Sequence, residues 1–313
     1  MNLQDQEIAL PLKQGTSQEK KWKRIAYLCL LILAALFIGY AIASYLSYES
    51  VVAYGKEIYF QMDEKFLWML AVGFLAQMVD GALGMGYGVV STTLLLSGGM
   101  SPAVISGSIH TAEMFSSGAS GFSHYRFGNV NKKLFKTLLI PGVLGAIGGA
   151  LLLGYAGEAF SGYIRPIISV YTLILGIKIL TNAFKEKAKP QKVKRAGWLA
   201  GAGGFLDSFG GGGWGPLVTS TLISKGRTPK YVIGSVSLTE FFVTMASAVT
   251  FFFILGVSHW QSIIGLLIGG VVAAPIAARL VGKLPIKKMF IGVAVIVILS
   301  SLRIIWMAIV KVV

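Results

Sequence analysis

Long apolar stretches alternate with short polar segments along most of this chain. A polar stretch at residues 1–23 is followed by an apolar run at 24–46, and further apolar stretches continue almost to the C-terminus. Several of them hold about 20 residues, which in helical form span the roughly 30 Å of hydrocarbon in a bilayer. The pattern predicts an all-α integral membrane protein whose first crossing helix follows a polar tail.

Two of the apolar stretches are interrupted near their middle by glycine. The first covers residues 66–98 and is broken at Asp80–Gly88, and the second covers 196–224 and is broken at Asp207–Gly215. Because glycine disfavours the helical conformation, such clusters do not sustain a straight helix. We expect each stretch to form a re-entrant hairpin of two half-helices, which enters and leaves the membrane at the same face.

Three uninterrupted crossing helices are expected after each broken segment. The first of each set begins at Ser101–Pro102 or Thr228–Pro229, which is typical of a capped helix N-terminus with proline in the first turn. The expected crossings are 101–126, 134–156 and 160–183 in one half of the chain, and in the other half 229–256, a helix ending at 279 and a last helix ending near 311.

The two halves of the chain repeat at a constant spacing. Asp207 follows Asp80 by 127 residues, and Glu240 follows Glu113 by the same number. We call this sequence separation the repeat spacing. Because each half contains an odd number of crossings, the halves must insert with opposite orientations, as in the inverted-topology repeats of secondary transporters. The expected organisation is a cytoplasmic polar tail at 1–23, an N-terminal transmembrane helix and outer loop at 24–65, repeat 1 at 66–184, a basic cytoplasmic linker at 185–195 and repeat 2 at 196–313.

The distribution of charge predicts the orientation and the compartment. The chain is 55% hydrophobic and 13% charged, with a formal net charge of +15. Its Lys and Arg residues gather between apolar segments, above all at 20–24 and 185–195, where membrane proteins keep their cytoplasmic loops. We expect a bacterial plasma membrane protein with its N-terminus in the cytoplasm and its C-terminus outside. The sequence has no basic stripe interleaved with aromatic residues, which is the pattern that would indicate nucleic-acid binding.

Other classes of site lack their usual residues. The single cysteine, Cys29, excludes an intrachain disulfide and a Cys-based metal cluster. The glycine runs do not follow a predicted strand and are not followed by Gly-Lys-Ser/Thr, so they are not nucleotide-binding motifs. The membrane segments also lack a nucleophile–base pair or a His-rich metal set. We therefore expect neither an enzyme nor a bound metal or cofactor.

Four of the 13 acidic residues lie inside apolar stretches: Asp80, Glu113, Asp207 and Glu240. Each glutamate lies eleven residues after the proline at the start of its helix. This separation places it about 17 Å along the helix and close to mid-bilayer. A charge at that depth costs at least about 2.5–3.5 kcal/mol. We therefore expect the two glutamates to line a transport pathway.

Polar residues at helical spacing share a face with each glutamate. These residues are Ser106, His110 and Ser117 around Glu113, and Ser237 and Thr244 around Glu240. His110 matches Ser237 at the repeat spacing, so the two half-sites are chemically unequal. From the sequence, His110 is as consistent with a proton relay as with a packing role.

The glycine breaks predict an anion site without a buried Lys or Arg. Half-helix N-termini carry unpaired N–H groups and the positive end of the helix dipole. Tyr87 and Trp214 are expected to wall the site and donate a hydrogen bond, whereas Asp80 and Asp207 are expected to hold the loop amides in place. The predicted substrate-binding residues are Gly84, Gly86, Tyr87, Gly88, His110, Glu113, Gly211, Gly213, Trp214, Gly215, Ser237 and Glu240.

Two transport mechanisms remain open at this point. Burial favours the neutral form of a carboxyl group, and a protonated Glu113 or Glu240 can donate a hydrogen bond to an oxyanion, which would link anion binding to a proton. Anion export is also favoured by an inside-negative potential. The alternative is a cation- or proton-coupled carrier that uses the four membrane carboxylates as ligands, since hard cations prefer oxygen ligands.

Residues 66–311 resemble the TauE/SafE family of sulfite-exporter-type permeases. The resemblance rests on the duplicated glycine breaks, the Ser/Thr-Pro openings and two related stretches, Gly-Ser-Ile-His-Thr-Ala-Glu at 107–113 and Gly-Ser-Val-Ser-Leu-Thr-Glu at 234–240. It implies a membrane permease that exports or takes up a small sulfur-containing anion, such as sulfite or a related sulfonate, without a cofactor. The departure at His110 and Ser237 leaves the chemistry of the two half-sites unequal.

Overall fold

The apolar patterning predicts helices, and helix is the only regular structure in the part of the chain that the structure describes. The computed structural model describes residues 56, 64–83, 85–157, 159–184, 195–256, 260–280 and 286–312. The predicted polar tail, the first transmembrane helix and most of the basic linker lie outside those residues. All the helices treated below belong to one compact unit, Met62–Val313.

The described helices divide into two sets at the basic linker. The first set is α3 (Glu64–Leu83), α4 (Tyr87–Ser97), α5 (Pro102–Arg126), α6 (Lys132–Ala156) and α7 (Ser161–Asn182). The second set is α8 (Ala196–Gly210), the π-helical turn η1 (Trp214–Thr219), α9 (Ser220–Ser224), α10 (Pro229–Leu255), α11 (Trp260–Leu280) and α12 (Ile286–Val312). In both sets the chain leaves the helical conformation at the glycine cluster and resumes it a few residues later.

The repeat spacing seen in the sequence also relates the helices. After each glycine break the chain forms a second half-helix. Tyr87 begins the one in the first set, Trp214 begins the one in the second set, and these two residues are one repeat spacing apart. Pro102 begins α5 and Pro229 begins α10 at the same separation. The counterparts are therefore α3 and α8, α4 and η1–α9, α5 and α10, α6 and α11, and α7 and α12.

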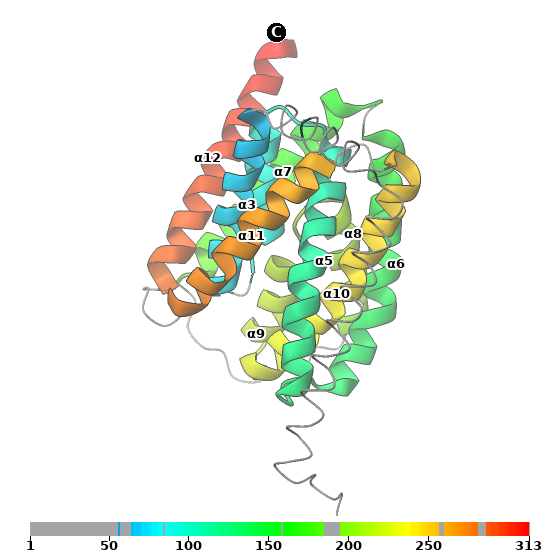
Figure 1. Cartoon of the computed structure of the whole chain (residues 1–313), viewed down its shortest axis with the longest axis vertical. Helices are drawn as coiled ribbons and strands as arrows, with labels where there is room; N and C mark the ends of the chain where they lie inside the picture. Colours follow the sequence, from blue (N-terminus) through cyan, green and yellow to red (C-terminus); the bar gives the residue numbers. More distant parts are fainter. Residues whose placement is uncertain are drawn as a thin grey trace, which may run out of the picture. The chain divides into compact units, whose positions relative to one another are not determined.

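Each broken segment packs on a crossing helix of the other set. The helix α3 contacts α11, and its counterpart α8 contacts α6, the counterpart of α11. In Figure 1, α11 crosses in front of α3. The central pair is α5 with α10, and α7 contacts α12. The two sets are thus interleaved, which brings both breaks into the interior of the unit.

Glycine allows the exchanged helices to approach closely. A Cβ placed on Gly73 of α3 would lie 2.7 Å from the Cα of Leu266 on α11, and one on Gly149 of α6 would lie 3.0 Å from the carbonyl carbon of Phe205 on α8. Small residues at helix interfaces are the usual means by which membrane helices associate. A side chain at either glycine would push a broken segment away from its partner helix.

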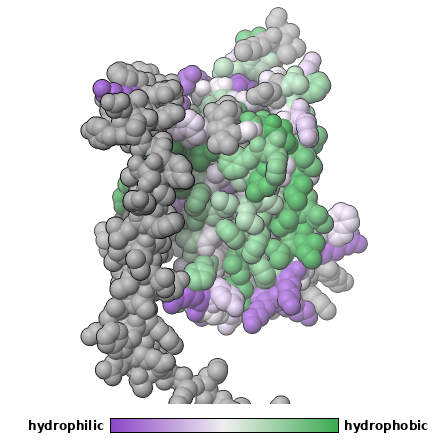
Figure 2. Space-filling model, turned by 45° about the vertical axis from the view of Figure 1, so that its right-hand side comes forward, coloured by the Kyte–Doolittle hydropathy of each residue, from purple (hydrophilic) through white to green (hydrophobic). Residues whose placement is uncertain are grey.

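The exterior of the unit suits a hydrocarbon environment. Figure 2 shows a broad hydrophobic surface over the middle of one face, with hydrophilic residues gathered along its lower edge. Large apolar side chains stand exposed on the outer helices, among them Ile140 and Leu144 on α6, Ile174 on α7 and Leu299 on α12. Apolar exposure on this scale is not typical of a soluble monomer. The prediction of an all-α membrane protein is confirmed for the described residues.

Four described helical stretches are long and apolar enough to cross a membrane: Lys132–Ala156, Ser161–Asn182, Lys230–Leu255 and Phe290–Val310. Of the other expected crossings, α11 contributes an apolar stretch at Trp260–Ala273 among the residues searched, and α5 is less apolar. The serines, glycines and buried glutamate of α5 lower its mean hydropathy, although its 25 residues are long enough to span the bilayer. Its polarity fits a helix that faces other helices rather than lipid.

The predicted starts of α5 and α10 are correct in position but not in chemistry. Ser101 and Thr228 both occupy the N-cap position with extended backbone angles, and proline follows each. Neither side chain, however, makes the capping hydrogen bond that the sequence predicts. Proline alone, which has a suitable φ angle and no N–H to satisfy, marks these helix starts.

Candidate functional site

The two glycine breaks touch each other in the interior. A Cβ on Gly88, in the first turn of α4, would lie 2.5 Å from the carbonyl oxygen of Gly211, and one on Gly212 would lie 2.5 Å from the backbone nitrogen of Val89. Gly86 and Gly211 also have positive φ angles of 122° and 66°, which residues with side chains rarely adopt. Glycine is thus required both for the turns and for the contact between them.

Hydroxyl groups from neighbouring helices fix the second break. Thr92 of α4 donates a hydrogen bond of 2.8 Å to the carbonyl oxygen of Gly211. Tyr171 of α7 donates one of the same length to the carbonyl oxygen of Gly212. Neither residue is predicted from the sequence, because each is one of several hydroxyl-bearing side chains in its helix and nothing in the spacing singles it out. Gly84, predicted to take part in the first break, lies outside the described residues.

Asp207 binds the backbone at the start of the second half-helix. Its Oδ1 accepts hydrogen bonds from the N–H groups of Gly213, at 2.6 Å, and Trp214, at 2.9 Å. Asp80 interacts in the same manner with the backbone N–H of Tyr87. Carboxylates therefore hold these amides, which is the role that the sequence predicts for Asp80 and Asp207. The N–H of Val89 has no acceptor among the described residues.

The buried imidazole of His110 connects α5 to the second break. Its Nε2 lies 3.2 Å from Oδ2 of Asp207, and its Nδ1 lies 2.7 Å from the carbonyl oxygen of Ser106. Because a carbonyl oxygen only accepts, Nδ1 must carry the donated proton. The contact at Nε2 then requires a second proton, either on the imidazole or on Asp207. The imidazole therefore links α5 to the carboxylate that holds the second break.

A second contact ties the same turn of α5 to the break. The hydroxyl of Ser106 donates a hydrogen bond of 2.5 Å to the carbonyl oxygen of Ser208, the residue after Asp207. The hydroxyl of Ser208 in turn bonds to that of Ser247 on α10. The polar face predicted for α5 therefore turns toward the second break.

The membrane carboxylates gather around this pair. Glu113, Asp207 and His110 each offer one ligand atom within 4.8 Å of the others. Glu113 also lies close enough to Glu240, Asp207 and Asp80 for their charges to interact. Glu113 is buried, and Glu240 is partly buried. The four acidic residues singled out in the sequence thus share one region.

The central helices face each other through equivalent residues one turn beyond the glutamates. The hydroxyls of Ser117 on α5 and Thr244 on α10 lie 3.4 Å apart, and the two residues are separated by the repeat spacing of 127 residues. Ser237, the counterpart of His110, has no such place in the polar network. Its carbonyl oxygen lies against Gly121 of α5, and no hydrogen bond within the described residues joins it to a carboxylate.

The two aromatic residues at the breaks lie in the interior. Tyr87 and Trp214 are both buried. The indole of Trp214 lies against Gly142 of α6, and its Nε1 donates to the carbonyl oxygen of Val236 at 3.3 Å. The indole N–H therefore donates to the backbone of α10, whereas the sequence predicts that it donates to an anion. A ring of this size explains why α6 needs glycine at position 142.

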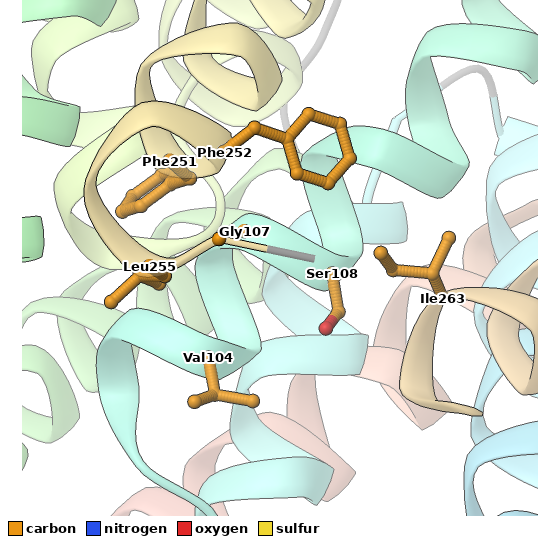
Figure 3. Close-up of a pocket in the computed structure, with 8 residues that line it drawn as sticks. Val104, Gly107, Ser108, Phe251, Phe252, Leu255 and Ile263 are labelled. Atoms are coloured by element: carbon orange, nitrogen blue, oxygen red, sulfur yellow. The ribbon is translucent and has the colours of Figure 1, made fainter. Parts of the chain in front are cut away.

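A small apolar pocket lies between α5, α10 and α11, next to the polar turn of α5. It is lined by Val104, Phe251 and Leu255 among others, and Figure 3 shows the hydroxyl of Ser108 standing among these apolar side chains. Its volume is about 20 Å³, which is enough for one water molecule. The buried hydroxyl of Ser108 has no partner among the described residues. A water fits this pocket, whereas an oxyanion with three oxygens does not.

Comparisons with known proteins agree with the resemblance seen in the sequence. The sequence profile of the family "Sulfite exporter TauE/SafE" matches residues 69–304. The probable membrane transporter protein YtnM of Bacillus subtilis (strain 168) is 40% identical over 251 residues, which cover 77% of this chain and 82% of that protein. No solved structure matches the chain. The family and this relative are membrane transporters rather than enzymes, and the chain belongs to the TauE/SafE family of membrane transporter proteins.

Proposed function

We propose that this protein exports a small sulfur-containing anion, sulfite or a related sulfonate or oxyanion, which binds where the two glycine breaks meet. The observation that carries the proposal is the contact between Gly88 and Gly211 beside Glu113. Gly211 is the C-cap of α8. The same junction also brings the starts of α4 and η1 together, because a Cβ on Gly215 in η1 would lie 3.2 Å from the Cα of Met85, one residue before the N-cap of α4. Helix N-terminal ends favour negative charge. The family profile, described as a sulfite exporter, supports the same class of substrate.

The donors for the anion differ in part from those that the sequence indicates. Asp207 occupies the amides of Gly213 and Trp214, so these groups fix the break rather than bind the substrate. The amide of Val89 and a protonated Glu113 are two donors at the junction that no carboxylate of the described residues occupies. Binding through Glu113, and through Glu240 on the facing helix, would link the anion to a proton.

The architecture that we propose is an inverted repeat in a bacterial plasma membrane. Each repeat is a re-entrant hairpin and three transmembrane helices, and one further transmembrane helix precedes the first repeat. The N-terminus lies in the cytoplasm and the C-terminus outside. The exchange of α3 and α8 between the two sets of helices supports a two-fold relationship of this kind.

A cation carrier is the second candidate, because His110, Glu113 and Asp207 could hold a metal ion. The contacts of Asp207 make this less favourable. One of its oxygens accepts two backbone amides, and the other faces His110. A cation would have to displace one of these partners. The substrate would then be a cation or a proton, with Asp80 and Glu240 as further ligands.

A flux assay in proteoliposomes tests the proposal. The purified full-length protein is reconstituted, and efflux is measured for a panel of sulfur oxyanions at two internal pH values. Efflux of sulfite or a related anion, faster than in protein-free liposomes, is expected. The heat stability of the detergent-solubilised protein discriminates the candidates, since a ligand of the native state stabilises it. Protection by divalent cations and not by sulfite would favour the cation carrier.

A further inference from the structure

Arg165 lies in the first turn of α7 and reaches the end of the first half-helix. Its Nη2 donates hydrogen bonds to the carbonyl oxygens of Gly99, at 2.5 Å, and Met100, at 2.9 Å. Its Nε is buried and has no partner among the described residues. Because a guanidinium carries five N–H groups, the two carbonyls leave most of its donor capacity unused.

The same guanidinium lines a cavity between α4, α7 and α12. The cavity has a volume of about 260 Å³, and Ser97 and Ser161 bring hydroxyl groups to it. Ile304 and Met307 of α12 close it with apolar side chains. Since liquid water occupies roughly 30 Å³ per molecule, a small oxyanion fits together with part of its hydration shell.

The N-terminus of α7 opens at this cavity. Ser161 and Gly162, its first two residues, line the cavity, and Phe160 at the N-cap position makes no side-chain capping bond. The first backbone N–H groups of a helix have no acceptor within the helix. They stand at its positive end, where they favour an anion. The hydroxyl of Ser97 donates to the carbonyl oxygen of Leu94, so the donors at the cavity are the guanidinium, the hydroxyl of Ser161 and the amides of Ser161 and Gly162.

The cation has no counterpart in the other half of the chain. The position one repeat spacing after Arg165 is Gly292, and nothing lies within 4 Å of the place where its Cβ would stand. The breaks, the glutamates and the helix starts are duplicated, but this charge is not. A residue that served only the common helical framework would be expected in both halves.

We propose that the Arg165 cavity is a second anion site, at the opposite end of the half-helix α4 from the central junction. The eleven residues of α4 separate the two sites by about 16 Å along the helix. Its ligand is a small oxyanion of the same class as the transported substrate, so the identity of the ligand rests on the proposed function. The site collects or releases the anion at one end of the pathway.

Three variants of the full-length protein test the site. Arg165→Gln removes the charge, Arg165→Lys keeps the charge without the planar donor fork, and Lys65→Gln removes an exposed charge at the start of α3 as the control. The half-saturating sulfite concentration for efflux is measured in proteoliposomes, and heat protection by sulfite is measured in detergent. A charge-assisted contact is worth about a tenfold change in affinity. We expect a three- to tenfold rise for Arg165→Gln, a smaller rise for Arg165→Lys and no change for Lys65→Gln.

The competing role for Arg165 is to hold the turn after α4 through the carbonyls of Gly99 and Met100. That role alone predicts that Arg165→Gln lowers the melting temperature while the half-saturating concentration and the sulfite protection stay at wild-type values, and that result overturns the second site. If Arg165→Gln does not fold, Arg165→Lys decides by the same two measurements. If the wild type carries no sulfur oxyanion, the proposed function fails. In that case the heat protection that sulfite gives to the wild type is compared with the protection that it gives to Arg165→Gln. Equal protection of the two proteins overturns the second anion site.

Discussion

His110 on α5 and Asp207 at the end of α8 are 97 residues apart in sequence and meet through a contact of 3.2 Å between Nε2 and Oδ2. The other oxygen of Asp207 holds the amides of Gly213 and Trp214. One carboxylate thus fixes the start of the second half-helix and connects it to the central helix of the other half. A shift of α5 against the break would change this contact, because the two residues belong to different halves of the chain.

Substitution of Asp207 should separate its two roles. Asp207→Asn keeps an oxygen that accepts from both amides, and its new amide group can donate to a neutral His110. Asp207→Ala removes the acceptor and leaves the imidazole without a partner. Loss of a helix cap costs about 0.5–2 kcal/mol, and loss of one partner of a buried pair costs about 3–5 kcal/mol. We expect the alanine variant to be much the less stable of the two in thermal unfolding. Equal melting temperatures would show that the amide contacts contribute nothing to stability.

The pH dependence of transport should depend on the central glutamates. A protonated carboxyl group is needed to donate to the anion, so binding should weaken as the pH on the loading side rises. Glu113→Gln and Glu240→Gln carry a neutral donor at every pH, and each should flatten the pH profile of the half-saturating concentration. Efflux from proteoliposomes loaded at a series of internal pH values measures this. If both variants keep the rate and the pH profile of the wild type, the link to protons is wrong.

The sequence predicts the framework of the site because that framework is repeated. The positions where the helices break and begin are well determined by the glycine clusters, prolines and glutamates, each of which occurs twice at one spacing. A glutamate near the centre of a membrane helix must also face the interior of the protein rather than lipid. Asp80 and Asp207 carry the same signal, since an acid at the edge of each break stands near the orphan amides of a helix start. Agreement between the halves provides the information that an alignment of related proteins otherwise supplies.

Several of the residues that the sequence does not predict lack a counterpart in the other half. Tyr171 and Arg165 on α7 reach the break and the end of α4, and nothing in the spacing of α7 marks them. The contact of His110 with Asp207 depends on how one half packs on the other, which periodicity does not report. The direction of the Trp214 indole toward Val236 likewise follows from packing. Sequence reasoning therefore finds the shared polar framework and misses the asymmetric details that distinguish the two ends.

The contact between the breaks should not tolerate a methyl group. A Cβ at Gly88 would lie 2.5 Å from the backbone oxygen of Gly211, and backbone atoms cannot move aside as a side chain can. Overpacking of this kind costs about 1–3 kcal/mol, so Gly88→Ala should lower the melting temperature and abolish efflux. The matched control is Gly292→Ala, because that position has open space around it. A Gly88→Ala protein with wild-type efflux would mean that the breaks do not touch during transport.

The inverted arrangement can be tested at two exposed residues that are one repeat spacing apart. Phe160 lies in the turn between α6 and α7, and Lys287 lies in the first turn of α12. Equivalent positions of an inverted repeat must face opposite sides of the membrane. In a Cys29→Ser background, Phe160→Cys should react with a membrane-impermeant thiol reagent added to intact cells, whereas Lys287→Cys should react only after the cells are opened. Labelling of both from outside would mean that the halves insert in parallel. The two half-helices would then enter from one face, and their N-terminal ends could not form a common site between the two sides of the membrane.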